Sequence, residues 1–147
     1  MNGKLFNGPM ELLLRALIIL TIKSPLNVDH ISMIDFVSTY GRYFGISENN
    51  LHGDNEFGLQ EFSLRRELMN DAIRQAVLKG LIEIVENQDG FSYKLSTNGT
   101  RVYSEISKSM YALEYSENAK KAENIVAVSN KEFMEMIDNK LWGGSIV

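Results

Sequence analysis

The spacing of apolar residues changes from helical to strand-like between Ser63 and Ser96, which is the most informative part of the chain. Gly80 divides this segment at a point where the end of a helix favours a residue that tolerates positive φ. Residues 81–86 and 91–95 are rich in β-formers and flank a turn-like sequence at 87–90. The residues before Gly80 that recur at helical spacing are Leu64, Leu68, Met69, Ala72, Ile73, Ala76 and Val77. The pattern predicts a helix, a two-stranded hairpin and a polar restart into another helix, which is the order of elements in a winged helix.

Two more helices are predicted before this segment. The first begins at Pro9, a residue that the first helical turn accepts, and ends at Ser24-Pro25. It is apolar on every side, which indicates that protein surrounds it. The second helix covers Asp29 to Phe44. The polar loop that follows, Ser47 to Gly58, has a length that is typical of functional or mobile loops.

One long helix with a kink near Ser116 is predicted after the hairpin, following the restart at Thr97-Asn98-Gly99, and its apolar stripe from Val102 to Val126 spans about seven turns. Apolar residues continue through it at intervals of mostly three or four. The residues of this stripe are Val102, Ile106, Met110, Leu113, Tyr115, Ala119, Ala122 and Val126.

The last predicted helix starts at Asn130. Ser129 and Glu132 fit a capping box, and Val128 with Phe133 fits the hydrophobic staple around it. The apolar side chains of this helix either cap the core of the domain or dock on a partner protein. They are Phe133, Met134, Met136, Ile137, Leu141 and Trp142.

These elements predict a mostly α fold of the α+β class. Residues 1–100 would form the winged-helix core, and residues 101–147 a helical extension packed on or beside it within a single domain. Winged helices either read DNA or serve as docking modules in larger assemblies. The charge of the chain is the feature that distinguishes DNA binding from protein docking.

The charge pattern argues against strong DNA binding by the chain alone. Its net charge is −4, whereas proteins that bind by neutralising phosphates usually carry a basic surplus. The window from Gln60 to Arg101 is neutral, because its bases (Arg65, Arg66, Arg74, Lys79, Lys94 and Arg101) equal its acids (Glu61, Glu67, Asp71, Glu83, Glu86 and Asp89) in number. Any contact with DNA should therefore be weak or depend on an assembled complex.

Four polar residues remain candidates for such a contact. Arg66, Asn70 and Arg74 form one row on the predicted third helix, and Lys94 lies on the hairpin. The alternative is a solvated helix face on which the arginines pair with Glu67 and Asp71.

Candidate chemistry is otherwise sparse. The chain has no cysteine, and His30 and His52 have no nearby acid pair at ligand spacing, so no metal site is expected. No glycine-rich phosphate loop or nucleophile elbow is present, so no catalytic residue, cofactor or small-molecule substrate is expected either. No signal peptide or membrane span is predicted, which favours a cytoplasmic protein.

Charged and aromatic residues at apolar positions are the candidates for partner contacts. Arg15 lies inside the first apolar helix and needs an acid, either Asp35 or Glu11 within the chain or an acid of another subunit. Arg65 either extends along the core edge or reaches a partner's acid. Tyr103, Tyr111 and Tyr115 line one face of the long helix, which is either core or interface. The candidate partner contacts are Arg15, Arg65, Tyr111, Phe133, Met136, Ile137 and Trp142.

Several segments together resemble the middle components of bacterial ABC-three-component systems. The resemblance spans nearly the whole chain in the right order. It is carried by LFNGPMELLLRALIIL (5–20), MIDFVSTYGR (33–42), the loop with Leu51, His52 and Asp54, LRRELMNDAIRQAVLKGLI (64–82) and residues 111–122.

The resemblance implies a role in defence against phage and plasmids. Such proteins are encoded between an SMC- or Rad50-like ATPase and an effector such as a nuclease, in systems of which Lamassu is one. The implied function is a non-catalytic winged-helix adaptor that links the ATPase to the effector. A free-standing winged-helix transcription regulator is the alternative from another class, and a toxin–antitoxin or other small interaction module is a third.

Overall fold

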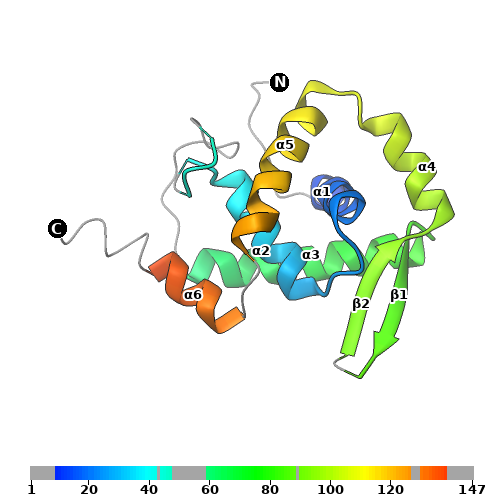
Figure 1. Ribbon diagram of the computed structural model, residues 1–147. Coiled ribbons are helices and arrows are strands. Elements are labelled where there is room, and N and C mark those ends of the chain that lie inside the picture. Colours follow the sequence, from blue (N-terminus) through cyan, green and yellow to red (C-terminus); the bar gives the residue numbers. More distant parts are fainter. Residues whose placement is uncertain (1–8, 43, 48–58, 89, 127–129, 139–147) are drawn as a thin grey trace.

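The computed structural model describes residues 9–42, 44–47, 59–88, 90–126 and 130–138. Within these ranges the chain forms six helices and one antiparallel hairpin (Figure 1), which confirms the mostly helical prediction. The winged-helix assignment stays a prediction. The elements are α1 (Pro9–Ile22), α2 (Val28–Thr39), α3 (Leu59–Leu78), β1 (Ile82–Asn87), β2 (Gly90–Leu95), α4 (Thr97–Ile106), α5 (Met110–Ile125) and α6 (Asn130–Asp138).

The first two helices form the centre of the molecule. α1 packs against α2, α3, α4 and α5, which surround it (Figure 1), as its apolar character on every side predicts. In α2 every residue from Ile31 to Thr39 is buried. Asn27 caps the start of α2 by accepting a hydrogen bond from the backbone N–H of His30 at 2.9 Å.

α2 ends at Thr39, so the prediction that it continues to Phe44 is wrong. The chain instead turns around Gly41, whose carbonyl accepts hydrogen bonds from the N–H groups of Phe44 and Ile46. This turn brings the ring of Phe44 back into the core, where it is 7% exposed. Burial of the ring outweighs the local periodicity that favoured a longer helix.

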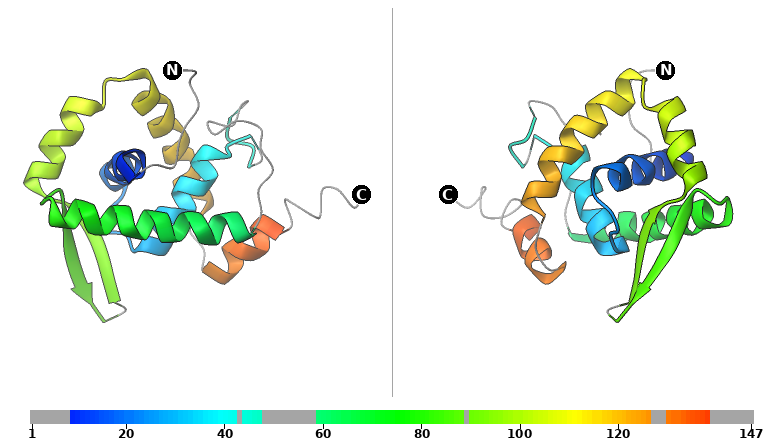
Figure 2. Two further views of the ribbon diagram at one scale, coloured as in Figure 1. Left: turned by 180° about the vertical axis from the view of Figure 1, so that it is seen from behind. Right: turned by 45° about the vertical axis from the view of Figure 1, so that its right-hand side comes forward.

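The end of α3 and the hairpin follow the predicted pattern. Gly80 has a φ of +76°, and the N–H of Leu81 donates to the carbonyl of Ala76, which closes the helix. β1 and β2 pair in antiparallel register from Ile82 opposite Leu95 to Asn87 opposite Gly90. The hairpin projects from the helical body at one end of α3, whereas α6 lies near the other end (Figure 2).

The buried face of α3 differs in part from the predicted stripe. Leu64 and Leu68, two residues of that stripe, are 57% and 36% exposed. The buried face is instead formed by Phe62 and Arg65 together with Met69. Helical spacing alone could not choose between these two adjacent faces.

The single long helix expected after the hairpin is wrong, because the chain breaks between Ile106 and Met110. Ser109 caps the new helix by accepting a hydrogen bond from the N–H of Ala112 at 3.1 Å. α4 and α5 therefore form an arch around α1 (Figure 2). The break also turns Met110 and Leu113 outward, where they are 73% and 53% exposed, so the apolar stripe predicted through them is wrong at these positions.

The start of α6 at Asn130 confirms the prediction from the capping box, although Val128, Ser129, Leu141 and Trp142 lie outside the described residues. Phe133 is fully buried, and its ring centroid lies 5.0 Å from that of Phe62 and 6.3 Å from that of Phe36. α6 therefore packs its apolar face on the protein's own core.

We expect Phe133→Ala to lower the free energy of unfolding by about 3–5 kcal/mol, because it removes a buried ring from an aromatic cluster. Chemical denaturation of the purified protein measures this change. Phe91→Ala is the matched control, since the Phe91 ring on β2 is 55% exposed and its loss should cost less than about 1 kcal/mol. Equal effects of the two variants would contradict the core position of α6.

Candidate functional site

Four helices meet at one buried carboxylate, that of Asp35 on α2. Arg15 of α1 places its Nε 3.4 Å from Oδ1, and Arg65 of α3 places its Nη2 3.0 Å from Oδ2. The hydroxyl of Tyr115 on α5 donates a hydrogen bond to Oδ1 at 2.6 Å. All four side chains are at most 3% exposed. We call these four residues the Asp35 cluster.

The electrostatics of the cluster keep the carboxylate ionised. Burial by itself would raise the pKa of Asp35, but the guanidinium groups of Arg15 and Arg65 and the hydroxyl of Tyr115 outweigh burial and lower it. Burial by itself would lower the pKa of Arg15, but Asp35, together with Tyr115, Tyr111 and Glu11, outweighs burial and raises it. Burial, together with the charge of Asp35, raises the pKa of Tyr115 well above its ordinary value. The cluster is therefore a set of fixed charges and a neutral phenol.

Aromatic rings surround the second guanidinium of the cluster. The Arg65 guanidinium lies 5.5 Å from the ring centroid of Phe36 and 5.4 Å from that of Tyr40. Tyr40 in turn donates a hydrogen bond to the carboxylate of Glu61. Burial and this carboxylate raise the pKa of Tyr40.

The position of the cluster bears on two of the expected partner contacts. Arg15 forms the internal pair with Asp35 that its apolar surroundings required. Arg65 pairs with the same carboxylate, a contact that the sequence alone did not lead us to predict. The available signal was that Arg65 follows Phe62 by three residues and precedes Met69 by four, so that it shares a helix face with these two buried residues. Both arginines are buried, so a partner cannot reach them in this conformation. Partner binding by Arg15 and Arg65 stays a prediction, and their burial argues against it.

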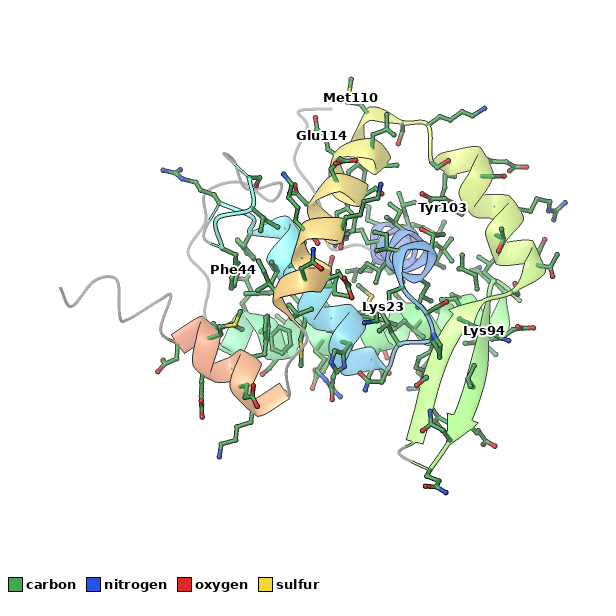
Figure 3. All side chains as sticks on the ribbon, in the orientation of Figure 1. Lys23, Phe44, Lys94, Tyr103, Met110 and Glu114 are labelled. Atoms are coloured by element: carbon green, nitrogen blue, oxygen red, sulfur yellow. The ribbon has the colours of Figure 1, made fainter. Side chains whose placement is uncertain are left out.

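The tyrosines of the second helical face are divided between two helices. Tyr103 lies half-buried on the side of α4 that faces α1 (Figure 3). Tyr111 is half-buried, and its ring packs edge-on against Tyr115 with a centroid distance of 6.2 Å. Burial raises the pKa of Tyr111 to about 12. The face is therefore core at Tyr115 and core edge at the other two positions.

Each basic candidate for DNA contact lies beside an acid. Arg66 pairs with Asp29 of α2, whereas the alternative of a solvated face expected the arginines to pair with Glu67 and Asp71. Arg74 lies 4.0 Å from the carboxylate of Asp71. Asn70, the uncharged member of the row, is half-buried.

On the hairpin, the ammonium of Lys94 (Figure 3) lies 3.9 Å from the carboxylate of Glu83 on the opposite strand. The predicted contact row and the hairpin thus present paired charges, which offer little net attraction to a phosphate backbone.

The C-terminal candidates occupy several environments. Phe133 and Ile137 are fully buried in the core of this chain, and Met136 is half-buried beside them. Trp142 lies outside the described residues. Of the two roles left open for this face, the structure places Phe133 and Ile137 in the role of core residues, and docking of a partner by them stays untested.

Hollows on the described surface differ in chemistry. One of about 390 Å³ has a mixed polar and apolar lining and lies between the α1–α2 connection, β2 and the end of α5. Lys23 (Figure 3) and Glu123 form an ion pair of 3.0 Å at this hollow, and His30 also lines it. A larger groove of about 690 Å³ lies between α1 and α3 and is bordered by exposed Met10 and Leu78.

Among the described residues, no three His, Cys, Asp or Glu side chains are grouped so that they could hold a metal ion. His52 lies outside these residues. In the same part of the chain, every helix is too short or too polar to cross a bilayer.

Residues 5–143 match the family model described as ABC-three component (ABC-3C) system Middle Component 2. No curated protein and no solved structure matches the chain.

We expect Asp35→Asn to lower the free energy of unfolding by about 3–5 kcal/mol, because it leaves two buried guanidinium groups without their carboxylate. Denaturant titration of both proteins measures the difference. Asp29→Asn is the matched control, since its pair with Arg66 is 34% and 38% exposed and should be worth less than about 1 kcal/mol. A smaller loss for Asp35→Asn than for its control would show that the cluster contributes no stability.

The stability that Asp35 supplies should depend on pH in a defined direction. Its folded pKa lies below the ordinary value of 3.8, so its contribution is complete above that value and is lost as pH falls through the folded pKa. The difference in unfolding free energy between wild type and Asp35→Asn should thus be constant near neutral pH and shrink below 3.8. Urea denaturation at pH 6, 5, 4 and 3 measures it; a difference that shrinks already between about pH 6 and 5 would contradict the lowered pKa.

Proposed function

The chain belongs to the Middle Component 2 family of ABC-three-component systems, and from that premise we propose that it is a non-catalytic adaptor. In this proposal it links an SMC- or Rad50-like ATPase to an effector subunit, such as a nuclease, in a cytoplasmic complex of the Lamassu type that defends against phage and plasmids. Membership in a family of middle components implies other components for it to contact. The adaptor role, the identity of those components and the defence function are the proposed part.

The pairing of charges on α3 and the hairpin carries the choice of an adaptor over a DNA reader. Arg66, Arg74 and Lys94 each lie within 4.0 Å of a carboxylate. A protein that releases counterions from DNA needs basic side chains whose charge is not already balanced. A transcription regulator would need such a surface, and the described face does not supply it.

The hairpin supports the same choice through its apolar face. The side chains of Ile84 and Phe91 on the hairpin are 47% and 55% exposed. Large apolar side chains on a wing that binds DNA would gain no binding energy from contact with phosphates. Ile84 and Phe91 lie on the same face of the hairpin as Ile82, which is only 2% exposed because it lies at the base of the hairpin. The acid Glu86 lies directly opposite Phe91 in the register. An apolar face with an acid at its end suits a protein surface better than a nucleic acid.

The arrangement of α3 followed by the hairpin is the part of the chain that we interpret as a winged helix. This unit would occupy residues 1–100, and residues 101–147 would form the helical extension. α5 packs against both α1 and α2, so the extension would be held firmly enough to act with the winged helix as one rigid connector.

Co-expression of this chain with the ATPase and effector components of the same system should yield a complex that survives size-exclusion chromatography. Light scattering of the eluted peak gives its composition. If the chain elutes alone from co-expressed material in which the other two components associate with each other, the adaptor proposal fails.

The isolated chain should bind DNA weakly, with a shallow dependence on salt. Because Arg66, Arg74 and Lys94 on the described part of α3 and the hairpin each lie beside a carboxylate, the logarithm of the binding constant should fall with the logarithm of salt concentration at a slope below about 3 in magnitude. Fluorescence anisotropy with a labelled duplex between about 50 and 200 mM salt measures this slope. Tight, sequence-specific binding at about 150 mM salt would instead favour the transcription regulator.

A further inference from the structure

Helix α3 has three distinct faces along its length. One face is buried and carries Phe62, Arg65 and Met69, and a second carries the polar row of Arg66, Asn70 and Arg74. We call the third face the leucine stripe. At 3.6 residues per turn, its residues lie within an arc of about 80° around the helix axis. It consists of Leu64, Leu68, Asp71, Gln75 and Leu78.

The leucine stripe combines exposed apolar side chains with an adjoining groove. Leu64 is 57% exposed, Leu68 36% and Leu78 79%. The groove of about 690 Å³ between α1 and α3 is lined by four residues of the stripe, Leu68, Asp71, Gln75 and Leu78, and is bordered on the α1 side by Met10, which is 70% exposed. Single exposed leucines are common on soluble proteins, but a row beside an apolar groove marks an interaction surface.

The spacing along the stripe indicates the shape of the occupant. Its residues follow one another at intervals of four, three, four and three, an average of about 3.5, which is the period of a seam between two helices packed along their length. From Leu64 to Leu78 the seam is about 21 Å long at 1.5 Å per residue. An α-helix of about four turns fits this seam.

Charges along the stripe distinguish a foreign helix from a second copy of this chain. Glu67 lies towards the start of the stripe, Asp71 at its centre, and Arg74 and Lys79 towards its end. The side chains of Asp71 and Arg74 are 72% and 71% exposed, so both can meet charges of a partner. Parallel pairing of two copies would set each charge against its like.

Antiparallel pairing of two copies sets Glu67 of one copy near Arg74 of the other at the edge of the stripe, but it is disfavoured at the centre of the seam itself. The arrangement that sets Leu64 of one copy against Leu78 of the other brings the two Asp71 carboxylates together at the centre, where like charges repel. A different protein can place a base near Asp71 and an acid near Arg74 and Lys79. Charge complementarity therefore favours a foreign helix over self-association.

We propose that the leucine stripe and its groove bind one amphipathic α-helix of another component of the three-component complex. That helix carries apolar residues at alternating intervals of three and four, a basic residue opposite Asp71 and an acidic residue opposite Arg74 and Lys79. The proposal rests on the proposed adaptor function and names the surface through which the adaptor binds.

Substitutions in the stripe test the surface in the complete complex. Leu64→Glu and Leu78→Glu should each weaken assembly with the ATPase and effector components by at least about tenfold, because each places a carboxylate in an apolar seam. Leu113→Glu is the matched control, since Leu113 is a leucine of similar exposure (53%) on α5, and it should assemble as wild type does. Thermal denaturation shows that the variants remain folded.

The outcomes separate the two proposals. If the wild-type chain fails to assemble with either component, the adaptor function and the stripe both fail. If wild type assembles and Leu78→Glu assembles equally well, only the stripe is overturned. If the isolated wild-type chain is a dimer that Leu78→Glu converts to a monomer, a second copy occupies the stripe and the inference is overturned as well.

A cysteine crosslink identifies the occupant itself. The chain contains no cysteine, so Gln75→Cys gives the stripe a unique attachment point for a maleimide photocrosslinker. In the complex we expect a crosslink to a segment of the ATPase or effector with apolar residues at intervals of three and four. Lys120→Cys on α5, an exposed control position, should not give this product. A crosslink from Gln75→Cys to a segment without that spacing would overturn the proposed helix.

Discussion

The carboxylate of Asp35 is the interaction on which the arrangement of the helices depends. It lies on a fully buried stretch of α2 and receives the guanidinium groups of α1 and α3 and a hydroxyl of α5. Such a group is costly to bury alone, because its hydration is lost. It is tolerated here only if Arg15, Arg65 and Tyr115 arrive together with correct geometry. Apolar residues of equal volume could supply similar stability, so the particular effect of the cluster is to specify how four helices pack.

The use of two arginines inside the protein affects the surface as well. The chain has a net charge of −4, and Arg15 and Arg65 are not available to any partner in this conformation. The basic residues that remain on α3 and the hairpin are balanced by Asp29, Asp71 and Glu83. Beside these pairs, α3 and the hairpin also expose large apolar side chains, among them Leu64, Leu78 and Phe91. That combination is better suited to contacts with other proteins than to neutralising a nucleic acid.

The division of α3 into three faces connects the core to the proposed interaction surface. Its buried face supplies Arg65 to the Asp35 cluster and Phe62 to the aromatic group around Phe133. Because Phe62 and Arg65 are held near the start of α3 and the buried Ile73 and Ala76 continue the same face towards its end, the rotation of α3 about its axis is fixed. The leucine stripe is thereby presented at a defined angle beside α1. A rigid scaffold under an exposed apolar seam reduces the entropy lost on binding.

The elements that depend on local chemistry could be predicted from the sequence alone. The start of α1 at Pro9, the end of α3 at Gly80, the hairpin and the start of α6 at Asn130 all follow from turn and capping preferences within a few residues. The need of Arg15 for an acid also follows from the sequence, since a charge within an apolar helix must be paired.

Other features were decided by tertiary structure. α2 ends early because Phe44 is buried by a turn, and the expected long helix divides at Ser109 so that α4 and α5 can surround α1. The choice of buried face on α3 required Asp35, a residue 30 positions before Arg65 in the chain. Local periodicity states which residues share a helix face, but only packing against distant segments decides which of those faces is buried and which remains exposed for a partner.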